Sequence, residues 1–313
     1  MSQKYHIARN GTGPKPVVRI QLDHDGECSV NSVAITPDGR RAVYGGEDRT
    51  VRVWDLERDR LVISFEGHPC RSPEEPTNYI YNMAVTPDGR YAVSGGEERM
   101  VRVWDVERGQ CIAALEGHSA GISAVAISAD GRRVVSGGWD KTVRAWDVRE
   151  GRCLATLEGH VDVVDCLAIT ADGQRAFSGG WDDARIWDLE RGVCVSVFHD
   201  DCMHDIAITP DGRRAVSRGC GAKVRIWDLE RAECVHVIRA SSAGGVALSG
   251  DGRIAVITPG MHITVWDAER KRFLARYEPS LEVVSDVAIG GDGRIFAWDW
   301  NGLLFIWPPV KVN

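Results

Sequence analysis

An Asp-Gly pair that recurs at a nearly constant spacing is the feature that most constrains the fold of this chain. The seven pairs begin at Asp38, Asp88, Asp130, Asp172, Asp211, Asp251 and Asp292. A tryptophan follows each pair at a similar distance, giving Trp54, Trp104, Trp146, Trp187, Trp227, Trp266 and Trp307. A period of about 41 residues over almost the whole chain is typical of a solenoid, an array or a propeller. The 313 residues therefore need no division into two domains.

Each repeat reads as short strands separated by turns. In the third repeat, alternating apolar residues predict strands over residues 122–128, 132–137, 142–147 and 153–159. The turns between them contain Gly and Asp, and Asp-Gly supplies the positive φ that a tight hairpin needs. No helical periodicity competes with this pattern, so we expect an all-β fold.

The motifs EGH, PDGRRAV, SGG and VWD recur in this order, and through them residues 17–307 resemble the WD-repeat family. The resemblance implies a seven-bladed β-propeller of four-stranded antiparallel blades. We expect residues 17–313 to form this single domain and residues 1–16 to form a flexible lead-in. The stretch VVRIQLD at 17–23 matches the strand before EGH in other repeats. We therefore expect it to become the outer strand of the last blade, which closes the ring and removes an open sheet edge.

The resemblance also implies a hydrogen-bonded chain within a blade, in which a turn carboxylate, a histidine, a serine and a tryptophan follow one another. The residues concerned are His118, Ser136, Asp140 and Trp146 in the third repeat and His160, Ser178, Asp182 and Trp187 in the fourth. A hydrolase triad is the competing interpretation, but the set recurs and a G-x-S-x-G elbow is absent. We therefore expect no catalytic residues and no enzyme.

The network is expected to decay in other repeats. Glu98 takes the place of the carboxylate Asp in the second repeat. The fifth repeat keeps His199 and Ser217, but Gly221 replaces the Asp.

Function is expected where the repeats differ. In the resembled family, the residue before the turn Asp and two residues at the start of the first strand lie on the top face around the central channel. These positions contain Tyr79, Tyr81, Trp139, Asp165, Trp181, His204 and Trp300. Exposed aromatic residues are typical of binding hot spots. The alternative is that the rings pack on neighbouring blades and plug the channel mouth. The loop PCRSPEEPT at 69–77 is expected beside them on the same face.

The fifth repeat contains a possible metal set. His199, Cys202, His204 and Cys220 are two histidines and two cysteines, which are common Zn²⁺ ligands, although their spacing matches no zinc-finger pattern. A degenerate loop is the simpler interpretation, and we expect no cofactor. Four further cysteines occupy one position in the outer strand and are expected to be small buried hydrophobic residues: Cys111, Cys153, Cys194 and Cys234.

Composition narrows the class of partner. A net charge of -7 and a pI of about 5.7 argue against a general nucleic-acid or anionic-membrane surface. No apolar run reaches the length of a membrane span, and the N-terminus lacks the core of a signal peptide. Nine cysteines without such a signal suggest free thiols and a cytoplasmic location.

The expected function is a non-catalytic protein–protein interaction scaffold whose aromatic top face binds a peptide or protein. We expect a monomeric propeller within a complex, with no nucleic acid and no membrane as partner. One alternative is a propeller that binds a metal or small ligand through its fifth blade. Another is the sensor module of a larger signalling assembly.

Overall fold

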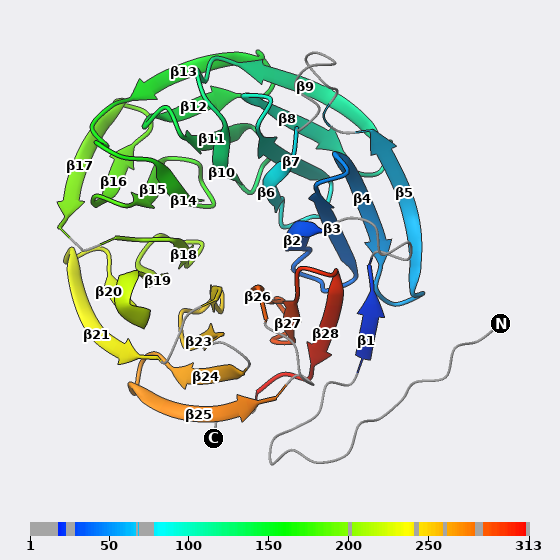
Figure 1. Ribbon diagram of the computed structural model, residues 1–313. Coiled ribbons are helices and arrows are strands. Elements are labelled where there is room, and N and C mark those ends of the chain that lie inside the picture. The colour runs from blue at the N-terminus through cyan, green and yellow to red at the C-terminus, as the bar shows by residue number, and fades with distance from the viewer. Residues whose placement is uncertain are drawn as a thin grey trace.

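The computed structural model describes residues 18–22, 29–66, 68, 78–199, 202–240, 244–258, 262–278 and 284–310. The expected lead-in at 1–16 and the loop at 69–77 lie outside these residues. The described residues form seven four-stranded antiparallel sheets arranged in a ring (Figure 1). The fold is therefore a seven-bladed β-propeller, as the resemblance to the WD-repeat family implies.

The first four blades follow one another along the chain. Blade 1 contains β2 (Val30–Ile35), β3 (Arg41–Gly46), β4 (Thr50–Asp55) and β5 (Arg60–Glu66). Blade 2 contains β6 (Ile80–Val85), β7 (Tyr91–Gly96), β8 (Met100–Asp105) and β9 (Gln110–Glu116). Blade 3 contains β10 (Ile122–Ile127), β11 (Arg133–Gly138), β12 (Val143–Asp147) and β13 (Arg152–Leu157). Blade 4 contains β14 (Val164–Ile169), β15 (Arg175–Gly180), β16 (Ala184–Asp188) and β17 (Val193–Phe198).

The last three blades complete the ring. Blade 5 contains β18 (Asp205–Ile208), β19 (Arg214–Arg218), the 3₁₀ turn η1 (Cys220–Ala222), β20 (Lys223–Asp228) and β21 (Glu233–Arg239). Blade 6 contains β22 (Val246–Leu248), β23 (Ile254–Ile257), β24 (Ile263–Asp267) and β25 (Arg272–Tyr277). Blade 7 contains β26 (Asp286–Ile289), β27 (Ile295–Trp298), β28 (Leu303–Trp307) and β1 (Val18–Gln21). Among the described residues, no helix is long and apolar enough to cross a lipid bilayer.

The Asp-Gly turn explains why each repeat begins with a tight hairpin. Gly39 has a φ of 64°, a backbone conformation that costs glycine little. Asp38 Oδ1 accepts hydrogen bonds from Thr36 Oγ1 at 2.5 Å and from the Arg40 amide at 3.0 Å. These bonds lock the turn, because an Asp side chain can satisfy backbone donors two residues further on.

The core lies between neighbouring blades. Trp146 of blade 3 is buried in one cluster with Val93 and Val101 of blade 2. Trp187 of blade 4 packs in the same way with Val135 of blade 3. Each repeated tryptophan of this kind therefore fills the space between two sheets.

The first strand closes the ring as predicted. In Figure 1, β1 lies beside β28, and the two pair antiparallel with Val18 opposite Ile306 and Gln21 opposite Leu303. Ile20 is buried in a cluster that contains Phe296 of blade 7 and Trp54 of blade 1. Both ends of the described chain thus contribute to one blade, so that blade needs no outside partner strand.

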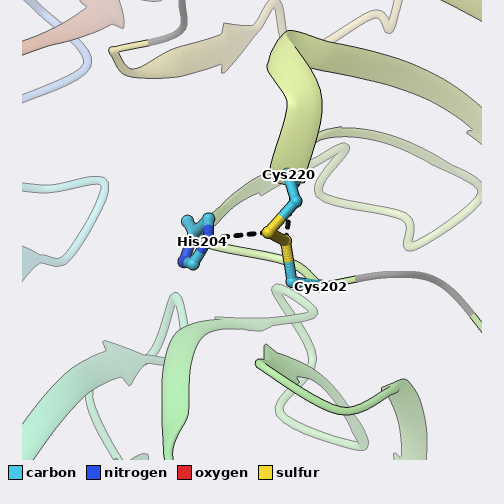
Figure 2. A group of neighbouring side chains, drawn as sticks. All are labelled: Cys202, His204 and Cys220. Atoms are coloured by element: carbon cyan, nitrogen blue, oxygen red, sulfur yellow. Dashed lines mark hydrogen bonds between the residues drawn. A yellow bond between two sulfur atoms is a disulfide. The ribbon is translucent and has the colours of Figure 1, made fainter.

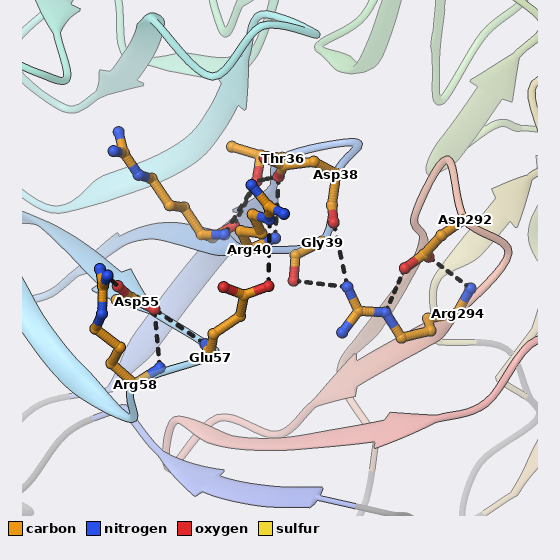
Figure 3. A network of polar contacts seen from close by, with 10 residues as sticks. Thr36, Asp38, Gly39, Arg40, Asp55, Glu57, Arg58, Asp292 and Arg294 are labelled. Atoms are coloured by element: carbon orange, nitrogen blue, oxygen red, sulfur yellow. Dashed lines mark hydrogen bonds and ion pairs between the residues drawn. The ribbon is translucent and has the colours of Figure 1, made fainter.

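A second set of bonds joins blades 7 and 1 at the Asp-Gly turns. Figure 3 shows Arg294 reaching from blade 7, and its Nη2 donates to the carbonyl oxygens of Asp38 at 3.2 Å and Gly39 at 3.1 Å. The Gly291 amide also donates to the Pro37 carbonyl at 2.6 Å. The ring is therefore closed by side-chain and backbone bonds in addition to the shared sheet.

The prediction that the four outer-strand cysteines are buried was wrong. Cys111 and Cys234 are exposed, and Cys153 and Cys194 are half-buried. Each lies opposite a repeated tryptophan, where a bulge shifts the register of the outer strand. The outer strand is covered by the ring only near its far end, at positions such as Leu115, so residues at its start meet solvent.

Candidate functional site

The hydrogen-bonded chain of blade 3 lies inside the sheet. Asp140 Oδ2 is 2.8 Å from His118 Nδ1, and His118 Nε2 is 2.7 Å from Ser136 Oγ. Trp146 Nε1 donates to Ser136 Oγ at 2.8 Å. Because a carboxylate only accepts, His118 Nδ1 donates to Asp140, and the Ser136 hydroxyl lies between His118 Nε2 and Trp146 Nε1. The four side chains therefore form one continuous hydrogen-bonded chain inside the blade.

Blade 4 has the same arrangement. His160 Nδ1 donates to Asp182 at 2.9 Å, Nε2 lies 2.7 Å from Ser178 Oγ, and Trp187 Nε1 donates to that hydroxyl at 2.7 Å. Burial lowers the pKa of His160, and the Asp182 carboxylate offsets this only in part. In blade 3, burial opposes ionisation of Asp140, but the bond and charge of His118 together with hydrogen bonds from the Ser119 amide and Thr142 outweigh it and hold the Asp140 pKa well below its usual value.

These serines are placed to stabilise the blades. Ser136 and Ser178 are buried, and each hydroxyl is shared between a histidine and a tryptophan. A nucleophilic serine would have to face a substrate. The sets therefore act as closed polar networks that fix the geometry of a blade.

Blade 2 keeps the histidine, serine and tryptophan of the network, and Glu98 takes the place of the carboxylate Asp, as the sequence shows. His68 Nε2 lies 2.7 Å from Ser94 Oγ, and Trp104 Nε1 donates to the same oxygen at 2.9 Å. Glu98 Oε1 is 2.7 Å from His68 Nδ1, and Arg102 Nε donates to the same Glu98 oxygen at 2.5 Å. The longer glutamate side chain still reaches the histidine, and Arg102 binds the same carboxylate.

In blade 5, His199 does not occupy the position that the sequence predicted. Trp227 Nε1 donates to Ser217 Oγ at 2.8 Å, so half of the network is present. His199 is 85% exposed and pairs with Asp183 of blade 4, with Nδ1 3.0 Å from Oδ1. Since Gly221 offers no carboxylate, nothing in the turn holds an imidazole inside this blade.

A pocket of about 500 Å³ opens where the first strands and the following turns of blades 2 to 5 meet. It brings together five of the seven residues predicted for the top face and two that the sequence analysis missed. The lining residues are Tyr81, Ser123, Trp139, Asp165, Trp181, His204 and Arg218. We call this the aromatic pocket.

Two ring pairs form walls of the aromatic pocket. Tyr81 and Trp139 have ring centroids 5.4 Å apart, and Trp181 meets His204 edge-on at 4.8 Å. Trp139 is 47% exposed and Trp181 is 56% exposed. The repeated tryptophans of the same two blades, Trp146 and Trp187, are buried. The two tryptophans Trp139 and Trp181 therefore expose indole surface to solvent at one site.

Polar contacts hold the other ring of each pair. The Tyr81 hydroxyl donates to Glu97 Oε1 at 2.6 Å, and burial together with this carboxylate raises the pKa of Tyr81. His204 Nδ1 donates to Asp165 Oδ2 at 3.0 Å. These bonds fix the rings that support Trp139 and Trp181.

Two predicted residues lie outside the aromatic pocket. Trp300 is 53% exposed in the equivalent turn of blade 7, but it is not among the lining residues. Tyr79 is half-buried at the start of blade 2 and does not line the pocket either. The structure thus gathers five of the predicted residues in the pocket and leaves Tyr79 of blade 2 and Trp300 of blade 7 apart.

Three residues at or beside this site were not predicted from the sequence: Ser123, Arg218 and Val161. A signal for Arg218 was present, because the first four blades have glycine at its position: Gly45, Gly95, Gly137 and Gly179. Val161 is 70% exposed and lies between the two tryptophan turns. Its carbonyl accepts from Lys141 Nζ at 2.7 Å, and its amide donates to Asp182 Oδ2 at 2.8 Å.

Three of the four residues proposed as metal ligands lie together. Figure 2 shows Cys202 and Cys220 joined by a disulfide, with His204 beside them. His204 Nε2 is 3.6 Å from Cys220 Sγ. The expectation that these two cysteines are free thiols was wrong, because the strand start and the turn of blade 5 place their sulfur atoms in contact. His199 is not part of this cluster.

The ring of blades and the repeated Trp–Ser–His–carboxylate chains define a seven-bladed propeller with internal polar networks. The family model described as WD domain, G-beta repeat, matches residues 16–55, 60–105, 109–147 and 151–188, together just over half of the chain. The chain therefore belongs to the WD-repeat family, whose propellers commonly serve as protein-interaction scaffolds.

One relative shows how local the sequence similarity to other proteins is. A stretch of 39 residues is 41% identical to the general transcriptional corepressor TUP1 of Saccharomyces cerevisiae. The match covers 12% of this chain and 6% of TUP1. The chain thus matches only a small part of this relative's length, and the likeness concerns about one repeat.

Proposed function

We propose that this chain is a non-catalytic interaction scaffold that binds a peptide or protein through the aromatic pocket. The observation that carries the proposal is that Trp139 and Trp181, from adjacent blades, each expose about half of their surface in one pocket. Exposed tryptophans in a concave site are the residue type that dominates protein interfaces. An inserted apolar or aromatic side chain would bury both indoles.

The rings are already positioned for binding. Trp139 lies over the backbone of Gly121, where a Cβ atom would come within 3.4 Å of the indole. Tyr81 packs against the same indole and is itself held by Glu97. Side chains that are fixed before binding lose less conformational entropy in the complex.

The polar groups of the aromatic pocket would orient the partner. Asp165 and Arg218 bring a carboxylate and a guanidinium to the pocket lining, beside the apolar rings. A few polar groups in an apolar site usually set the direction of a ligand, while ring burial supplies most of the affinity. Val161 extends the apolar surface between the two tryptophan turns.

The proposal is tested by selecting peptides from a random phage-displayed library against the folded propeller. Selected peptides should lose binding to the Trp139→Ala/Trp181→Ala variant. They should keep binding to Val193→Ala/Val195→Ala, which removes exposed apolar side chains from the outer strand β17. Equal binding of the peptides to wild type and to both variants would contradict the proposal. The binding site would then lie elsewhere, and the two indoles would only fill the mouth of the channel.

A further inference from the structure

The cysteine and histidine cluster of blade 5 has the composition of a metal site. The ligand atoms of Cys202, His204 and Cys220 all lie within 4.8 Å of one another. Cys202 and His204 precede β18, and Cys220 begins η1, so the three come from two segments that the blade brings together (Figure 2). Two sulfur atoms and one imidazole nitrogen form a donor set that Zn²⁺ prefers.

The surrounding hydrogen bonds support the ligand role of each atom. His204 Nδ1 donates to Asp165, which leaves Nε2 as the nitrogen near the sulfur atoms. Histidines that bind metals commonly donate their other ring N–H to a carboxylate. The Cys220 amide donates to Cys202 Sγ at 2.6 Å, a type of bond that also stabilises a metal thiolate.

Blade 5 departs from the repeat at the two positions that supply the sulfur atoms. In blade 3, the Trp139 amide donates to the Gly121 carbonyl at 2.8 Å. In blade 5, Cys220 stands in place of that tryptophan and Cys202 in place of that glycine. In blade 5, the Cys220 amide donates to Cys202 Sγ, and the disulfide joins the turn to the start of the strand.

We propose that the reduced form of this cluster binds Zn²⁺ through the thiolates of Cys202 and Cys220 and through His204 Nε2. A dithiol reductant supplies two electrons and two protons, so the disulfide becomes two thiols and the reductant becomes a disulfide. Zn²⁺ then displaces the two thiol protons and accepts the lone pair of Nε2. Water fills the fourth tetrahedral position that these three ligands leave open.

The turn around Cys220 has the backbone freedom that this change requires. The sulfur atoms must move apart from bonding distance to the separation of two ligands on one metal ion. Gly219 and Gly221 flank Cys220, and Gly221 already has a φ of 67°. The oxidised and zinc-bound forms would thus be two alternative states of one cluster. This inference does not depend on the proposed peptide partner.

The experiment uses the full chain purified without a metal-affinity column. The protein is reduced with a dithiol, freed of reductant under argon and titrated with Co²⁺ and then Zn²⁺. We expect sulfur-to-cobalt charge-transfer absorption that saturates at about one equivalent per chain, followed by displacement of cobalt by zinc. The oxidised protein, which carries no substitution, should show no such absorption.

Variants assign the ligands. Cys202→Ser/Cys220→Ser should abolish the charge-transfer band, whereas Cys153→Ser/Cys194→Ser on the outer strands should leave it unchanged. Asp165→Asn, which removes the partner of His204, should weaken binding by about 10- to 100-fold. Circular dichroism checks that each variant is folded.

Three results would overturn the proposal. The first is reduced wild-type protein whose two additional thiols react with a thiol probe but which binds no cobalt or zinc. The second is a disulfide that resists the dithiol while the protein stays folded. The third is equal metal binding by the Cys202→Ser/Cys220→Ser variant.

Discussion

The indole N–H of Trp146 donates to Ser136 Oγ over 2.8 Å inside blade 3. Trp139, three residues beyond that serine, exposes almost half of its surface. In blade 3, Trp146 therefore stabilises the sheet, whereas Trp139 is exposed to solvent.

Replacing the buried indole should cost stability that replacing the exposed one does not. Trp146→Phe removes the donor to Ser136 and leaves a buried hydroxyl with one partner fewer, so we expect a loss of about 1–3 kcal/mol in the free energy of unfolding. Trp139→Phe should change it by less than about 0.5 kcal/mol. Urea unfolding of both variants measures the difference, and equal losses would refute the assignment.

Stability should fall as the pH drops from 7 to 5. Burial lowers the pKa of His160 in the folded state. The unfolded chain therefore binds a proton there at a pH at which the folded chain does not, and acidification through this range favours unfolding. Urea unfolding at several pH values should show this decline, and His160→Asn should make it shallower. His199→Asn, at an exposed position, is the control. A stability that stays flat or rises on acidification would contradict the account.

The lowered pKa values of Asp140 and Asp182 act at lower pH. Their contribution is present above the unfolded-state pKa of about 4 and is lost as the pH falls through the folded-state values. A second decline in stability below about pH 4 is therefore expected. Asp140→Asn should reduce its steepness.

Glu98 should contribute to the stability of blade 2, although most other repeats do not have glutamate at this position. It is buried between His68 and Arg102. Glu98→Gln removes the charge and leaves both partners with a weaker acceptor, so we expect a loss of about 2–4 kcal/mol. Glu57→Gln, which removes an exposed ion pair with Arg40, should cost less than about 1 kcal/mol. A Glu98→Gln variant as stable as Glu57→Gln would show that the contacts of Glu98 do not stabilise the fold.

Closure of the ring should depend on β1. Ile20→Ala opens space in the cluster shared by blades 7 and 1 and should cost about 2–5 kcal/mol. Arg19→Ala on the same strand removes a guanidinium over the Phe305 ring and should cost about 1 kcal/mol or less. Thermal unfolding with light scattering would detect both the destabilisation and any association through the freed edge of β28. Wild-type stability in Ile20→Ala would mean that β1 does not close the ring.

The repeats made the fold predictable because the Asp-Gly turns and buried tryptophans mark every blade. The strand at β1 was predictable for the same reason, since its alternation matches the outer strand of other repeats. Side-chain reach was less predictable. The contact of Glu98 with His68 in blade 2 depends on side-chain conformation, and the same Glu98 oxygen also accepts from Arg102.

Contacts between blades and local exposure were the other features that sequence could not supply. His199 occupies the sequence position of the repeated histidine, but its side chain is exposed and pairs with Asp183 of blade 4. The cysteines of the outer strands looked apolar, but a bulge and the rim of the ring expose them. Which of the top-face residues share one pocket depends on how blades 2 to 5 meet, so the separation of Tyr79 and Trp300 from the others appears only in the structure.

The most direct test of the central claim is the dissociation constant of a selected peptide for wild-type protein and for Trp139→Ala/Trp181→Ala, measured by calorimetry at equal ionic strength. Loss of two central aromatic contacts predicts a weakening of about 100-fold or more. The melting temperature should stay within about 2 °C of wild type, because neither indole is part of the buried core. An unchanged dissociation constant in the folded double variant would contradict the account.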